Sequence, residues 1–183
     1  MQHSGFGRSC IFFAATLGMV FHVIPRIHTL SVVAAQASFW IFATIIAFWM
    51  APIVAQYTGT SVARVFFITA GMFASMSLYG YTTKKDLTGW GSFLMMGFFG
   101  IYIGFLVNAF FIQSTALHFA MSVIGVLVFA GLTAWDTQRI KNEYAEHYGD
   151  DTLAKMAILG ALGLYMNFIN MFLMLLTLFG NRN

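Results

Sequence analysis

Long apolar stretches without charge alternate with short polar segments along the chain. No Asp, Glu, Lys or Arg occurs within 27–63, 65–83, 87–135 or 156–181. An unpaired charge at mid-bilayer costs roughly 2.5–3.5 kcal/mol, so intervals of this kind mark membrane-spanning segments. At about 20 residues per span, the intervals hold one, one, two and one helices. With the shorter apolar stretch near the start, the pattern predicts six spans: 10–24, 31–56, 63–82, 91–111, 117–136 and 156–179.

Two of these assignments need a further argument. The interval 87–135 is too long for one helix, and the polar triplet at 113–115, Gln-Ser-Thr, supplies the turn that divides it. The stretch 10–24 has the length of a signal-peptide core, but Pro25, Arg26 and His28 intervene before the small residues that follow, so a membrane helix fits better. No soluble linker separates the spans, and we interpret residues 1–183 as a single polytopic, all-α transmembrane domain.

Composition agrees with this interpretation and excludes several classes of protein. Only 8% of the 183 residues are charged, against about 25% in soluble domains. Hydrophobic residues make up 60%, so apolar side chains must cover the outside of the protein as well as its interior. The single cysteine, Cys10, permits neither an internal disulfide nor a cysteine-based zinc or iron–sulfur site. The nine basic residues are dispersed, which argues against nucleic acid as a partner.

The distribution of basic residues between the spans predicts the orientation. With six helices, Arg8, Arg64 and Arg182 fall on one side, and the other six of the nine basic residues fall on the opposite side: Arg26, Lys84, Lys85, Arg139, Lys141 and Lys155. Connections rich in Lys and Arg remain in the cytoplasm, so the side with six is assigned there. Both ends of the chain then lie outside the cytoplasm. One additional helix before residue 10 would bring the N-terminus inside.

Asp136 is the one acidic residue that falls inside or at the end of a predicted span. An acid at membrane depth usually faces the protein interior or a water-filled path, which indicates ion handling. The alternative is a helix-end aspartate paired with Arg139 three residues later. The residues alone favour neither interpretation over the other.

Helical periodicity predicts what lies opposite Asp136. A stripe of mostly small or polar residues shares its face of the helix: Ser122, Gly125, Phe129 and Thr133. The last span carries a similar stripe: Gly160, Gly163, Asn167, Asn170 and Met174. Small residues allow helices to approach closely, and buried amides need partners in lipid. We therefore expect the two stripes to face each other, with Asn167 beside Asp136.

Other candidate chemistry is weak. His22 and His118 lie in or near spans, but no paired-histidine spacing supports haem ligation between them. The sequence contains no glycine-rich phosphate loop, Gly-x-Ser-x-Gly elbow or His-Glu-x-x-His motif. We therefore expect no enzymatic activity and no bound cofactor.

Three segments resemble one known family. They are 69–87 (TAGMFASMSLYGYTTKKDL), 131–141 (GLTAWDTQRIK) and 159–176 (LGALGLYMNFINMFLMLL). Together they are similar to the Bax inhibitor-1 family, also called the transmembrane Bax inhibitor motif family, and most similar to its bacterial YccA-like branch. The resemblance covers nearly the whole chain. It implies a bundle of seven helices with a cytoplasmic N-terminus, of which this chain would lack the first.

The resemblance also implies an activity and a site. Family members are proposed to be pH-sensitive calcium leaks, gated by two membrane aspartates that share a hydrogen bond near the cytoplasmic side. Asp136 matches the first aspartate. The family pattern Leu-Tyr-Leu-Asp-Phe-Ile-Asn appears here as LYMNFIN at 164–170, so Asn167 stands in the second position. The family's arginine contact to this pair has only approximate counterparts, Arg26 and His22.

The asparagine changes the expected mechanism. Two adjacent carboxylates resist double ionisation and share a proton, which makes the pair a proton-gated latch. An Asp–Asn pair cannot share a proton in this way, and the amide instead donates to the carboxylate and favours its charged form. The predicted ion pathway and gate comprise Asp136, Asn167, Asn170 and Thr133, with Asp136 as a transient calcium ligand.

Two functions follow from the resemblance. The first is a calcium leak channel with altered or lost pH gating, located in the bacterial inner membrane, with calcium as transported ion and the lipid bilayer as surroundings. The second is a non-conducting regulatory protein that binds a membrane partner such as a membrane-bound protease. The charged connection 139–155 is the expected docking segment for that partner.

Overall fold

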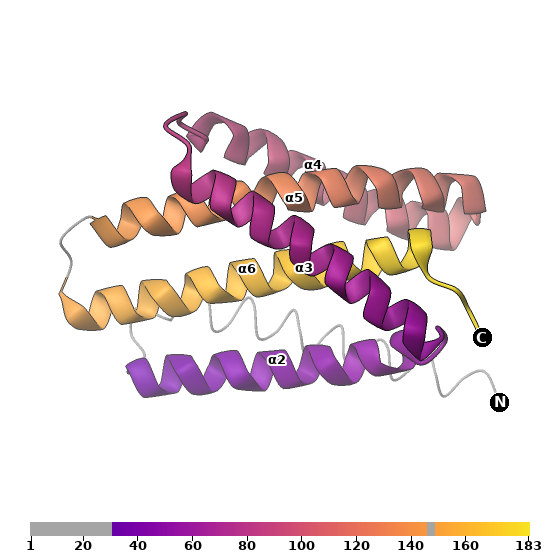
Figure 1. Ribbon diagram of the computed structural model, residues 1–183, viewed down its shortest axis with the longest axis horizontal. Helices are drawn as coiled ribbons and strands as arrows, with labels where there is room; N and C mark the ends of the chain where they lie inside the picture. The colour runs from indigo at the N-terminus through magenta and orange to yellow at the C-terminus, as the bar shows by residue number, and fades with distance from the viewer. Residues whose placement is uncertain (1–30, 146–148) are drawn as a thin grey trace. The chain divides into compact units, whose positions relative to one another are not determined.

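The computed structural model describes residues 31–145 and 149–183. Five helices in this part are long and apolar enough to cross a membrane. They are α2 (Val32–Val54), α3 (Gly59–Thr82), α4 (Thr88–Val107) with the π-helical turn η2 (Asn108–Ile112), α5 (Thr115–Ala145) and α6 (Asp150–Phe179) (Figure 1). The predicted count of six is not matched, because the expected span 10–24 lies outside the described residues.

The described residues form two compact units, and the boundary between them falls inside α6. The first unit contains 31–56 and 149–162, and the second contains 57–145 and 163–183. In the first unit, the hydroxyl of Ser31 accepts a hydrogen bond from the N–H of Ala34 and caps the start of α2. Pro52 lies inside α2, close to its end, where the loss of one hydrogen bond disturbs the helix least.

In the second unit, α5 packs against both α3 and α4. Glycines permit the close approach. A Cβ atom on Gly80 of α3 would overlap the backbone of Ala134, and one on Gly91 of α4 would overlap the ring of Trp135. Larger side chains at these two positions would force the helices apart.

The polar triplet at 113–115 divides the long apolar interval, as predicted, and the structure adds how the turn is closed. Gln113 adopts a left-handed conformation with φ of 52°, which ends the π-helical turn. The side chain of Asn108 donates to the carbonyl oxygen of Ser114 and accepts from its N–H, at 3.0 and 2.9 Å. This buried amide therefore satisfies backbone groups that the turn leaves without partners.

Two helices continue beyond the spans that the hydropathy pattern predicts. α5 extends to Ala145 instead of 136, and α6 begins at Asp150 instead of 156. The charged residues that end a membrane span do not end a helix, because Arg139 and Glu143 form an i,i+4 ion pair that supports a further turn. Asp136 consequently lies within a continuous helix and not at its end.

The end of the chain contacts the start of α3, an arrangement that we call the C-terminal clasp (Tyr57, Thr58, Ser61, Asn181 and Arg182). Thr58 N–H donates to the carbonyl oxygen of Asn181 at 3.0 Å, and Asn181 N–H donates to the hydroxyl of Ser61 at 2.9 Å. The guanidinium carbon of Arg182 lies 5.7 Å from the ring centroid of Tyr57. These contacts join the C-terminal end of α6 to the N-terminal end of α3.

Candidate functional site: a buried aspartate between α5 and α6

Asp136 lies on the face of α5 that contacts α6, and only 6% of the residue is exposed. Each of its carboxylate oxygens has a partner. Nη2 of Arg139 lies 3.0 Å from Oδ1, and Nδ2 of Asn167 donates a hydrogen bond of 2.7 Å to Oδ2. A carboxylate removed from water is costly unless it is paired and hydrogen-bonded. The two contacts therefore explain how α5 accommodates an acid in an apolar setting.

Both interpretations of Asp136 describe part of the geometry. The i+3 pair with Arg139 is present, and so is the contact across helices with Asn167. The two predicted stripes also face each other at other levels. Gly163 of α6 lies beside the carboxylate of Asp136, and Gly125 of α5 lies against the sulfur of Met174.

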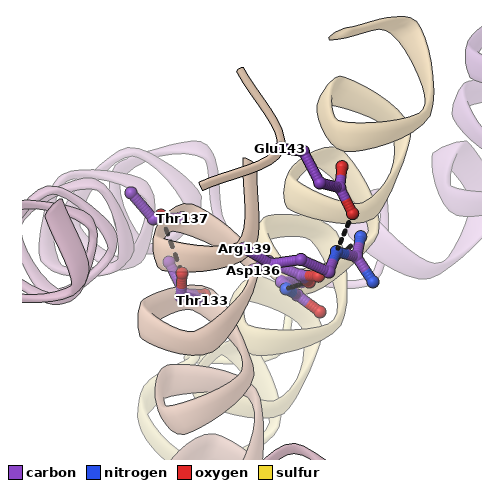
Figure 2. A network of polar contacts seen from close by, with 6 residues as sticks. Thr133, Asp136, Thr137, Arg139 and Glu143 are labelled. Carbon is purple, nitrogen blue, oxygen red and sulfur yellow. Dashed lines mark hydrogen bonds and ion pairs between the residues drawn. The ribbon is translucent and has the colours of Figure 1, made fainter. Parts of the chain in front are cut away.

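Charges of alternating sign continue from Asp136 toward the end of α5. Nε of Arg139 lies 3.6 Å from Oε1 of Glu143, an ion-pair distance that is too long for a hydrogen bond. The guanidinium carbon also lies 4.8 Å from the ring centroid of Trp135. Figure 2 shows Arg139 between the two carboxylates, with its guanidinium turned away from the threonines of the same helix. Arg139 is partly exposed, so this network connects the buried acid to the membrane surface.

Thr133 and Asn170, which were predicted to belong to the same site, make other contacts. The hydroxyl of Thr133 donates to the carbonyl oxygen of Phe129 within α5. The hydroxyl of Thr137 donates to the carbonyl oxygen of Thr133 (Figure 2). The amide of Asn170 donates to Met166 and accepts a hydrogen bond from the hydroxyl of Tyr102 on α4, each at 2.8 Å. Of the four predicted residues, the structure brings together Asp136 and Asn167.

Sequence reasoning missed two polar residues near this site. Tyr102 places a hydroxyl between α4 and α6, one helical turn along α6 from Asn167. Gln138 is buried and bonds to the connection between α3 and α4. A polar side chain within an apolar run was the available signal for Tyr102, and an amide two residues after Asp136 was the signal for Gln138.

Among the residues that the structure describes, few side chains near Asp136 could bind a metal ion. In that part of the chain, no group of three or more His, Cys, Asp or Glu side chains lies close enough to hold a metal ion. Calcium takes six to eight oxygen ligands in stable protein sites. A calcium ion at Asp136 would therefore take most of its ligands from water or backbone carbonyls, as suits transient passage. The arginine candidates from the sequence, Arg26 and its neighbour His22, lie outside the described residues.

The fold and the buried carboxylate define a multi-pass α-helical membrane protein with an ionisable group between its helices. Comparison with known proteins identifies its family. The family model described as inhibitor of apoptosis-promoting Bax1 matches residues 2–183. The chain belongs to the Bax inhibitor-1 family.

Bacterial relatives extend this result. An uncharacterized protein of Rickettsia prowazekii, RP147, is 43% identical over 182 residues, which cover 100% of this chain and 76% of the relative. The inner membrane protein YbhL of Escherichia coli is 46% identical over 170 residues, covering 92% of this chain and 72% of the relative. A protein of Caulobacter vibrioides is 51% identical over 151 residues, which cover 81% of this chain and 59% of the relative. The chain is a multi-pass protein of the bacterial inner membrane, and its assignment to a YccA-like branch stays a prediction.

Proposed function

We propose that the protein is a calcium leak channel of the Bax inhibitor-1 type whose gate holds a single titratable carboxylate. The observation that carries this proposal is the position of Asp136, buried between α5 and α6 with both oxygens engaged. Ionisable residues within membrane-spanning segments are rare and commonly mark ion pathways or proton relays. The activity requires no enzymatic step and no bound cofactor.

The contacts of Asp136 correspond to a closed gate. Arg139 and Asn167 each hold one of the carboxylate oxygens, so a cation that binds Asp136 must compete with both contacts and with the positive charge of Arg139. The asparagine donates a hydrogen bond but does not titrate, so the gate lacks the shared proton of a carboxylate pair. We therefore expect the flux to respond weakly to pH near neutrality.

Calcium efflux from vesicles containing the purified protein tests the proposal. Flux should be measured between about pH 6 and pH 8, because a buried carboxylate pair can hold its shared proton up to near neutral pH. Asp136→Asn, which preserves shape, should change the flux strongly, and Asn167→Asp should introduce a pH response that the original protein lacks. Asp86→Asn removes a carboxylate from the exposed connection between α3 and α4 and serves as the control. Equal flux from all four proteins at every pH would reject the channel.

A second candidate function is that of a non-conducting protein that binds a membrane partner, such as a membrane-bound protease. The specific observation in its favour is that a protein side chain already contacts each oxygen of Asp136, Arg139 at Oδ1 and Asn167 at Oδ2. Recovery of one membrane protein from detergent extracts, together with flux equal to that of empty vesicles, would support this alternative. Robust flux without a specific partner would exclude it.

A further inference from the structure

Three exposed lysines gather where α3 ends and α4 begins. Lys84 and Lys85 lie in the connection between the two helices, and Lys141 lies on α5. Nζ of Lys141 donates to the carbonyl oxygen of Tyr81 at 2.7 Å and lies 4.9 Å from the centroid of its ring. This contact places Lys141 beside the end of α3. We refer to Lys84, Lys85 and Lys141 as the lysine cluster.

The connection that carries two of these lysines is fixed to α5. The buried side chain of Gln138 accepts a hydrogen bond from the N–H of Leu87 and donates one to the carbonyl oxygen of Lys85, both at 2.8 Å. Because both bonds are made to backbone atoms on either side of Asp86, they hold the connection in one position. A binding site whose backbone is held in this way loses less conformational entropy when it takes up a ligand.

Within the described ranges 31–145 and 149–183, the lysine cluster keeps a net positive charge, because the connection that carries Lys84 and Lys85 holds one carboxylate, that of Asp86. The side chains of Lys84 and Lys85 form no hydrogen bond or ion pair there. The carboxylate of Asp86 accepts a hydrogen bond from the N–H of Thr88. Glu143 pairs with Arg139, and so does the buried Asp136, so neither of these acids faces the lysines as a free partner.

The cluster lies at the depth of lipid headgroups. α3 has 24 residues and is about 36 Å long at 1.5 Å per residue, against about 30 Å for the hydrocarbon core of a bilayer. The lysines directly follow its end. Tyr81, which contacts Lys141, is 57% exposed, and Trp90, in the first turn of α4, is 61% exposed. Such amphipathic rings favour the interface between membrane and water. An anion at this position therefore meets the ammonium groups of the lysines and also an apolar, lipid-facing surface.

We propose that the lysine cluster binds the phosphate headgroup of an anionic phospholipid such as phosphatidylglycerol. Ammonium groups recognise phosphate by charge and by hydrogen bonds, and basic pockets between transmembrane helices bind anionic headgroups. The exposed rings of Trp90 and Tyr81 suit the glycerol and acyl region of the same molecule, which favours a lipid over a soluble phosphate. This site is separate from the contact between Asp136 and Asn167, so the proposal does not depend on ion conduction.

Quenching of tryptophan fluorescence by brominated phosphatidylglycerol tests this proposal. Trp40→Phe and Trp49→Phe leave Trp90 and Trp135 as reporters, and Trp135 lies against Gly91 at the start of α4. In phosphatidylcholine vesicles, a specific site gives quenching that saturates at a low fraction of the brominated lipid. We expect Lys84→Gln and Lys85→Gln each to weaken apparent affinity about fivefold, the factor equivalent to about 1 kcal/mol per basic residue at an anionic surface. Gln138→Leu should also weaken the apparent affinity, because it releases the connection while all three lysines remain present.

Arg64→Gln is the matched control, because Arg64 lies near the other end of α3 and its loss removes the same charge. We expect it to leave the quenching curve unchanged. Equal quenching by brominated phosphatidylglycerol and phosphatidylcholine would overturn the proposal. Unchanged affinity in the variant that combines Lys84→Gln with Lys85→Gln would also overturn it. Displacement of the lipid by millimolar inorganic phosphate would show a site for free phosphate and would overturn the assignment to a lipid.

Discussion

At the scale of single residues, two aspartates show how surroundings determine the role of a carboxylate. Asp136 is buried between helices, and Arg139 and Asn167 each hold one of its oxygens. Asp86 is exposed in the connection between α3 and α4, where its Oδ1 accepts a 2.9 Å hydrogen bond from Thr88 N–H. The first aspartate constrains a contact between two helices, whereas the second closes a local turn just before α4.

The hydrogen bonds that Asp86 accepts from Thr88 predict a local dependence on pH. Hydrogen bonds from the hydroxyl and the N–H of Thr88 hold the pKa of Asp86 below its ordinary value of 3.8. A lowered pKa means that the stabilisation is complete above the ordinary value and is lost as the pH falls through the lowered one. Titration of the side-chain carboxyl by NMR should give a pKa below 3.8. Thr88→Val removes the hydroxyl and should return it toward 3.8, and an identical pKa in both proteins would contradict this account.

At the scale of helices, close approach to α5 organises the second unit. Gly80 and Gly91 come from α3 and α4, and they meet α5 at Ala134 and Trp135 on either side of the connection that Gln138 holds. In lipid, helices associate through van der Waals packing and interhelical hydrogen bonds, and small residues allow both. Asp136 therefore lies directly after a closely packed part of α5.

Gly80 provides a test of this packing. Gly80→Ala places a methyl group against the backbone of Ala134, which cannot move aside as a flexible side chain can. Overpacking of this kind costs about 1–3 kcal/mol in the free energy of unfolding. Gly71→Ala on the same helix is the matched control, because a Cβ atom there meets nothing within 4 Å. Unfolding in mixed detergent micelles should separate the two variants, and equal stability would show that α3 does not approach α5 as closely as described.

At the scale of the whole molecule, the contacts at the two ends of α3 fix which segments share a side of the membrane. The lysine cluster follows the end of α3, and Arg182 lies beside Tyr57 just before its start. Since α3 is long enough to span the hydrocarbon core, Lys84 and Arg182 lie on opposite sides. The distribution of basic residues assigns the lysine side to the cytoplasm.

Cysteine labelling in intact cells measures this orientation. In a Cys10→Ser background, Arg182→Cys should react with a membrane-impermeant thiol reagent added outside the inner membrane. Lys84→Cys should react only after the cells are opened. Reaction of both cysteines in intact cells, or labelling of Lys84→Cys alone, would contradict the predicted topology.

Much of this organisation was predictable from where charges are absent. Those intervals located five spans and the turn at 113–115, because charge is excluded from hydrocarbon. Helical periodicity placed Asn167 beside Asp136, because two small or polar stripes have few other surfaces to face. The bonds of Gln138 to the backbone of the α3–α4 connection were not predictable. They depend on where a connection folds back, which leaves no periodic pattern in the sequence.

The C-terminal clasp bears on the order in which the protein is completed during synthesis. Thr58 and Ser61, at the start of α3, find partners in Asn181, which the ribosome adds only after α6. Until then, the N–H of Thr58 and the hydroxyl of Ser61 depend on water or on other transient partners. The start of α3 is therefore synthesised well before the residues that complete its hydrogen bonds.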